Sequence, residues 1–159
     1  APTAQACPAG VPTGATCLRG QDSASAHYLI VMPAKWTGVL VVHAHGGPSY
    51  GPPKTTRADE DIKRWAITVR EGHAWAGSVF RQGGFAVTTA AEDTERVRRI
   101  FVEHVAKPKT TLLHGQSWGA MVATLGSSRA VSQAFEPIAR FRAAVAFYPG
   151  CFSIRPAAL

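Results

Sequence analysis

Residues 110–126 read TTLLHGQSWGAMVATLG, and this stretch decides the predicted fold. Thr110–His114 has the composition of a strand, and Ala120–Leu125 is predicted to be a helix. Between them, GQSWG at 115–119 matches the pattern G-x-S-x-G, in which a serine sits on a tight turn and projects its hydroxyl clear of the sheet. The residues two before and two after the serine must be small, because larger side chains would collide across the turn. The stretch therefore predicts a strand, a sharp turn and a helix, with Ser117 as the candidate nucleophile.

A second glycine-rich turn, His45-Gly46-Gly47-Pro48, directly follows the apolar run Gly38–Ala44. A continuous apolar run is typical of a strand that is covered on both faces. An oxyanion hole needs backbone N–H groups that point at a developing negative charge with no side chain in the way. Glycines after an early strand meet this need, and the N–H of Trp118 is a second predicted donor. A His-Gly-Gly sequence alone is more often an ordinary turn, but paired with the turn at 115–119 it indicates an oxyanion hole.

The order of the predicted elements indicates the fold class. Helices are expected over Ala58–Glu71, from a capping-box spacing at Thr89–Glu92 up to Pro108, and over the range 120–125. Strands are expected over His27–Pro33, Gly38–Ala44, Ala74–Phe80, Thr110–His114 and Ala143–Phe147. This alternation predicts an α/β protein with a predominantly parallel sheet and helices on both faces. Residues 1–26 are expected to form an extended N-terminal segment, followed by one domain over 27–159. Ligands of such sheets bind at the carboxyl ends of the strands, where both glycine-rich turns lie.

Composition and charge exclude several classes of protein. With 159 residues, 46% of them hydrophobic, the chain is long enough for one domain and too apolar to be disordered. The formal net charge is +7, but the basic residues are scattered and mixed with acidic ones, so no nucleic-acid partner is expected. The longest strongly apolar run, Tyr28–Met32, is far shorter than the roughly 20 residues of a membrane span. No membrane association is expected.

The cysteines indicate the compartment. Cys7 and Cys17 lie close together in a stretch rich in proline, glycine and threonine, where a disulfide would replace missing core contacts. The chain also starts at Ala1 among small residues, as after removal of a signal peptide. Both features favour a secreted or periplasmic protein, while two reduced cysteines in a cytosolic protein stay open as an alternative. Cys151 is left over and is expected to be a buried apolar residue. No second cysteine or histidine stands at metal-ligand spacing to it, so no zinc site is expected, and no cofactor is expected.

The two turns and the order of the strands resemble the N-terminal part of the α/β-hydrolase fold, over roughly residues 27–150. The closing sequence AAVAFYPGC at 143–151 is similar to the strand after the nucleophile turn in dienelactone-hydrolase-like members. The resemblance implies a serine hydrolase of carboxylic esters that forms an acyl-enzyme on Ser117. It also implies that the backbone amides of Trp118 and of Gly47, or of Gly46, hold the oxyanion.

The sequence departs from the family after the serine. Members place an Asp or Glu and then a histidine downstream of the nucleophile, and here the downstream sequence has no histidine and only one acid, Glu136. The chain is therefore expected to be a fragment, one piece of a two-chain enzyme, or a hydrolase-like binding protein with an incomplete site. An incomplete sheet also predicts self-association, or pairing with a C-terminal partner chain.

Upstream histidines are the alternative bases. His43 is expected in the buried strand, His104 on the apolar face of a helix, and His73 at a helix end. None of these positions suits a base well. Three residues are expected to line the site: His45, which would shape the glycine loop, His114 near the end of its strand, and Gln116.

Overall fold

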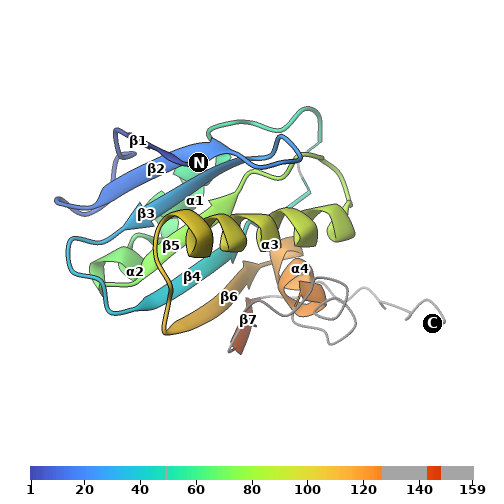
Figure 1. Ribbon diagram of the computed structural model, residues 1–159. Helices are drawn as coiled ribbons and strands as arrows, with labels where there is room; N and C mark the ends of the chain where they lie inside the picture. Colours follow the sequence, from blue (N-terminus) through green and yellow to red (C-terminus); the bar gives the residue numbers. More distant parts are fainter. Residues whose placement is uncertain (49, 127–142, 148–159) are drawn as a thin grey trace.

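The computed structural model describes residues 1–48, 50–126 and 143–147 (Figure 1). The elements are β1 (Thr3–Gln5), β2 (Thr16–Gln21), β3 (His27–Met32), β4 (Val39–Ala44), α1 (Arg57–Trp65), α2 (Ile67–Arg70), β5 (Ala74–Ser78), α3 (Val87–His104), β6 (Thr110–Gln116), α4 (Trp118–Gly126) and β7 (Ala143–Phe147). The five predicted strands are all present, with ends that differ by at most two residues. Cys151 and the turn after β7 lie outside the described residues.

The strands form one mixed sheet of seven in the order β1-β2-β3-β5-β4-β6-β7. The pairs β5–β4, β4–β6 and β6–β7 are parallel, whereas the pairs β1–β2, β2–β3 and β3–β5 are antiparallel. The prediction of a predominantly parallel sheet therefore holds for the central part only. The short connections between β1, β2 and β3 leave no room for the helical crossovers that parallel pairing requires.

The antiparallel strands β1 and β2 come from residues for which the sequence predicted only an extended segment. In β2, Cys17 is buried and lies opposite Val31 of β3, so this segment extends the sheet beyond β3. Cys17 forms a disulfide with Cys7, as expected. The pairing was missed because β1 has three residues and its side chains are all exposed, which leaves no periodic pattern to read.

Helices cover both faces of the sheet, as predicted. Long α3 crosses the front of the sheet in Figure 1, and α1 and α2 lie behind it. The core on the α3 side contains Leu40, Val42 and Phe101, and the core on the opposite side contains Ile62 and Trp75. Among the described helices, none is long and apolar enough to cross a bilayer.

Two helix predictions were wrong in detail. The helix expected over Ala58–Glu71 is interrupted at Ala66, where the N–H of Val69 donates to the Ala66 carbonyl, three residues back, in place of the four-residue spacing of an α-helix. The capping box predicted at Thr89–Glu92 is absent, because α3 already begins at Val87. Thr89 instead donates its hydroxyl to the Gln82 side chain at 3.3 Å, and Glu92 forms an ion pair with an arginine of the preceding loop.

Candidate active site

Ser117 stands alone between a strand and a helix. Strand β6 ends at Gln116 and helix α4 begins at Trp118, so the whole change of direction falls on Ser117. Its φ is +55°, one of three positive values among the described non-glycine residues, and its side chain is exposed. A non-glycine residue in this region is strained, and such strain is concentrated at functional sites.

The glycines on either side of Ser117 are required by close approach across the turn. A Cβ on Gly115 would lie 2.6 Å from the carbonyl carbon of Gly119 and nearer still to its oxygen. A Cβ on Gly119 would lie 2.7 Å from the carbonyl carbon of Ala44, at the end of β4. Real Cβ atoms essentially never approach within 3.0 Å of such atoms. The turn therefore brings β6, α4 and the end of β4 into direct backbone contact.

The glycine loop after β4 lies against this turn. Because β4 and β6 are parallel neighbours with Ala44 opposite Gly115, their carboxyl ends and the loops after them are adjacent. A Cβ on Gly46 would be 2.8 Å from the carbonyl oxygen of Gln116 and 3.5 Å from the Cβ of Ser117. Gly47 has a φ of +73°. The loop thus passes beside the serine at a distance that only glycine allows.

Backbone donors are available at this junction. As the first residue of α4, Trp118 has an N–H with no acceptor inside its own helix. The carbonyl oxygen of Gly46 accepts hydrogen bonds from Arg57 Nη2 at 3.2 Å and from His45 Nδ1 at 3.3 Å. In a trans peptide the C=O and N–H point in opposite directions. Holding the Gly46 carbonyl with two donors therefore fixes the N–H of Gly47 on the side away from Arg57.

His45 is buried next to the glycine loop and hydrogen-bonds the Gly46 carbonyl. The ring is 3% exposed and stacks on Phe80, with centroids 4.1 Å apart. Burial lowers the pKa of His45 to about 4, so the ring is neutral at pH 7. Its Nδ1 carries the hydrogen, since the Gly46 carbonyl can only accept one. No hydrogen bond among the described residues joins His45 to Ser117, and the role of His45 in shaping the loop stays a prediction.

His43 and His114 form a pair on the α1 side of the sheet. They are opposite each other in β4 and β6, with Nδ1 atoms 2.8 Å apart and stacked rings. Burial lowers the pKa of His114 to about 4, and it lowers that of His43 well below its usual range with a further contribution from His114. Asp61 Oδ1 is 3.9 Å from His43 Nε2, and burial raises the pKa of Asp61 to about 6. Both rings are neutral at pH 7, and the Trp65 ring packs edge-on against His114.

Of the remaining candidates, His73 and His104 lie away from Ser117, whereas Gln116 directly precedes it. His73 precedes β5 and hydrogen-bonds Thr37 Oγ1 at 2.9 Å, at the end of the sheet opposite Ser117. His104 is exposed at the end of α3, so the prediction that it packs on an apolar face was wrong. The helix ends at this residue, and the apolar stripe does not extend to it. The side chain of Gln116 accepts a hydrogen bond from Arg64 at 3.1 Å.

A pocket of about 200 Å³ opens beside the glycine loop. Gly47 and Trp118 line it together with Phe80 and Tyr50. Phe80 has a φ of +60°, a strained value for a bulky residue. Sequence reasoning had no signal for this strain, because nothing in the composition around Phe80 differs from that of an ordinary strand end.

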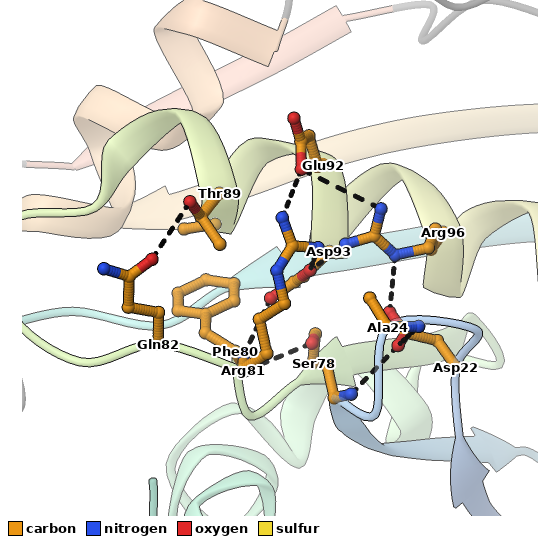
Figure 2. Close-up of polar contacts among 12 residues, drawn as sticks. Asp22, Ala24, Ser78, Phe80, Arg81, Gln82, Thr89, Glu92, Asp93 and Arg96 are labelled. Atoms are coloured by element: carbon orange, nitrogen blue, oxygen red, sulfur yellow. Dashed lines mark hydrogen bonds and ion pairs between the residues drawn. The ribbon is translucent and has the colours of Figure 1, made fainter. Parts of the chain in front are cut away.

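An ion-pair network holds the strained segment in place (Figure 2). The N–H of Phe80 donates to Ser78 Oγ at 3.1 Å, and the N–H of Arg81 donates to Asp93 at 2.8 Å. The Arg81 guanidinium lies between Asp93, at 2.7 Å, and Glu92. Burial raises the pKa of Asp93 to about 6, and the hydrogen bond and charge of Arg81 oppose that shift. The network anchors the loop after β5 to α3.

The fold is similar to that of solved esterase structures. An esterase/lipase from an uncultured bacterium matches 86% of this chain and 45% of its own at 18% identity, with a TM-score of 0.60. Esterase B from Lactobacillus rhamnosis matches 83% of this chain and 47% of its own at 18% identity, with a TM-score of 0.57. The chain has part of the α/β-hydrolase fold.

A further solved structure has the same fold over most of this chain. The rice cell wall degrading esterase LipA from Xanthomonas oryzae matches 81% of this chain and 39% of its own at 12% identity, with a TM-score of 0.54. This chain thus spans less than half the length of each of these α/β-hydrolases, which fits the expected resemblance to the N-terminal part of the fold. No protein-family model and no curated protein matches the sequence.

Proposed function

We propose that this chain carries the nucleophile and the oxyanion hole of a serine hydrolase that acts on carboxylic esters. The observation that carries the proposal is Ser117 itself, exposed at a φ of +55° on a turn that tolerates only glycine on both sides. The names of structurally similar proteins, which include esterases and a lipase, support an ester substrate.

In the proposed reaction, Ser117 Oγ attacks the carbonyl carbon of the ester and loses its proton to a base. The carbonyl oxygen becomes an oxyanion, which accepts hydrogen bonds from the N–H groups of Trp118 and Gly47. Collapse of this intermediate breaks the ester bond, and the alcohol leaves with the proton from the base. Water then attacks the acyl-enzyme by the same steps and releases the acid.

The base is proposed to come from another segment or chain. His45, His43 and His114 are neutral at pH 7, but each is held in the packing and hydrogen bonds described above, and none is hydrogen-bonded to Ser117 in the described structure. Loss of a triad member typically lowers kcat by about 10⁴ to 10⁶. We therefore expect the 159-residue chain alone to be slow and the whole gene product to be active.

A second candidate is a hydrolase-like binding protein with no turnover. It is favoured because, within the described residues, no histidine is hydrogen-bonded to Ser117. In either case the proposed partners are a small ester or its products, and a second copy or a C-terminal chain that completes the sheet. The Cys7–Cys17 disulfide supports the proposal that the protein is secreted or periplasmic.

A fluorophosphonate probe separates the two candidates, because it reacts only with an activated serine. The whole gene product is treated with the probe and its intact mass is measured, with Ser117→Ala as the test variant. Ser25→Ala is the matched control, since Ser25 is also exposed and has a φ of +66°. We expect one adduct in the wild type and in Ser25→Ala, and none in Ser117→Ala. An unlabelled wild type supports the binding protein, and labelling that persists in Ser117→Ala contradicts the serine hydrolase.

A further inference from the structure

We propose that the pocket beside the glycine loop selects esters that carry a single aromatic ring, neutral or anionic, on the acyl or the alcohol side. This inference rests on the proposed function. Gly47 and Trp118, the two proposed oxyanion donors, also line the pocket. An ester carbonyl held by those two N–H groups would therefore place one of its substituents in the pocket.

The floor and the mouth of the pocket are aromatic. Phe80 and Trp118 meet edge to face on the floor, with centroids 5.8 Å apart, and His45 stacks on Phe80. At the mouth, the lining residue Tyr50 is 79% exposed. Its ring lies edge-on to that of Phe85, an exposed residue outside the lining, with centroids 6.4 Å apart. Exposed apolar rings at a pocket mouth are typical of a ligand site. A planar ring in the pocket would cover part of the exposed Tyr50 surface in an offset or edge contact.

The size of the pocket limits the ligand. Its volume is about 200 Å³, and an apolar cavity of roughly 150 Å³ is large enough to bind benzene. One ring with a short chain therefore fits, whereas a long fatty acyl chain does not.

The charges around the pocket limit the ring's substituents. Lys54 and Arg57 are among the lining residues, and the part of the lining that the structure describes holds no carboxylate. Arg57 is ion-paired with Glu60 at 3.4 Å and with Asp61 at 3.7 Å, so the positive charge offered to a ligand comes mainly from Lys54. His45 contributes no charge at pH 7 because its pKa is about 4. A ring with a positive substituent is disfavoured, and a phenol or a carboxylate is accepted.

The shape of the floor depends on the strained segment at Phe80. The hydrogen bonds from Phe80 to Ser78 and from Arg81 to Asp93 hold that backbone at its positive φ (Figure 2). Strain of this kind persists only where surrounding contacts over-determine it. Here it sets the Phe80 ring under His45 and against Trp118, at the base of the pocket.

Two matched pairs of esters test the proposal on the whole gene product. Methyl 3-phenylpropanoate against methyl 3-cyclohexylpropanoate tests the acyl side, and benzyl acetate against cyclohexylmethyl acetate tests the alcohol side. We expect kcat/KM to favour the aromatic ester by about three- to tenfold in one pair. Tyr50→Ala should bring this ratio close to one, and Phe80→Leu should lower it. Ile67→Ala removes another exposed apolar side chain, at the start of α2 and outside the pocket lining, and should leave the ratio unchanged.

The outcomes separate this inference from the proposed function. Hydrolysis of methyl butyrate that depends on Ser117, with no aromatic preference in either pair, overturns the inference alone. If no ester is hydrolysed, the proposed function fails, and calorimetric binding of 3-phenylpropanoate, benzyl alcohol and their cyclohexyl analogues decides the inference. Tighter binding of one aromatic ligand that Tyr50→Ala abolishes supports the pocket assignment. Equal binding of the aromatic and cyclohexyl ligands overturns it.

Discussion

Gly119→Ala should destabilise the protein although it places a better helix former in α4. In an ordinary helix interior this change stabilises by about 1 kcal/mol. Here the new Cβ would lie 2.7 Å from the carbonyl carbon of Ala44 and closer to the oxygen. Relieving the clash requires the end of β4 or the start of α4 to move by about 1 Å, an overpacking change that costs about 1–3 kcal/mol and occasionally more. Because the displaced groups belong to the backbone, we expect the free energy of unfolding to fall by about 3 kcal/mol, near the upper end of that range.

Urea denaturation of Gly119→Ala measures this loss. The control is Gly51→Ala, where φ is +97° but no atom lies within 4 Å of the new Cβ. It should lose only the cost of an alanine at positive φ, about 1–2 kcal/mol. A free energy of unfolding for Gly119→Ala equal to or above the wild-type value would refute the close contact between α4 and β4. Failure of Gly119→Ala to fold, with Gly51→Ala folded, agrees with it.

Three further perturbations test the surroundings of the site. Arg57→Met removes a charged donor from the Gly46 carbonyl and should lower kcat for p-nitrophenyl butyrate about 10- to 100-fold with little change in KM. The control is Arg64→Met, on the same helix, which should leave kcat unchanged. The pKa of His45 falls from 6.5 to about 4 on folding, so between these pH values the unfolded chain binds more protons than the folded one. The free energy of unfolding should therefore decrease as the pH falls from 6.5 to 4. Between pH 7 and 4, the wild type should lose up to about 3 kcal/mol more than His45→Phe in urea titrations, and parallel curves would contradict a buried neutral His45. Replacing both disulfide cysteines with serine should cost about 3 kcal/mol for a loop with a sequence separation of 10, and an unchanged urea midpoint would show that the N-terminal strands need no cross-link.

Local sterics explain why both turns could be predicted from sequence. The pattern of Gly115, Ser117 and Gly119 predicts a tight turn, and the structure has that turn. The contact that requires glycine at 115 is local, with Gly119, whereas the contact that requires glycine at 119 is with the distant Ala44. The apolar run of β4 likewise marks a strand covered on both faces, and its residues from Leu40 to Ala44 are buried. Spacing reflects the local contact of Gly115 and composition reflects the burial of β4, whereas the contact of Gly119 with β4 depends on how the strands pair.

Contacts between distant segments could not be predicted in this way. His43 meets His114 only because β4 and β6 pair in one register, and a shift of one residue would turn one ring to the other face. The hydrogen bond from Arg57 to Gly46 and the strain at Phe80 likewise depend on how α1 and α3 dock on the sheet.

The amino-acid sequence by itself determined the tight turn at Ser117, the glycine loop and the parallel strands that precede them, because local sterics and hydrophobic burial specify these features. Tertiary structure alone decided the antiparallel strands of residues 1–26, the neutral pair of His43 and His114, and the pocket floor at Phe80. These features depend on strand register and on the docking of helices. Both are set by the summed packing of many residues far apart in the chain, and no local pattern encodes them.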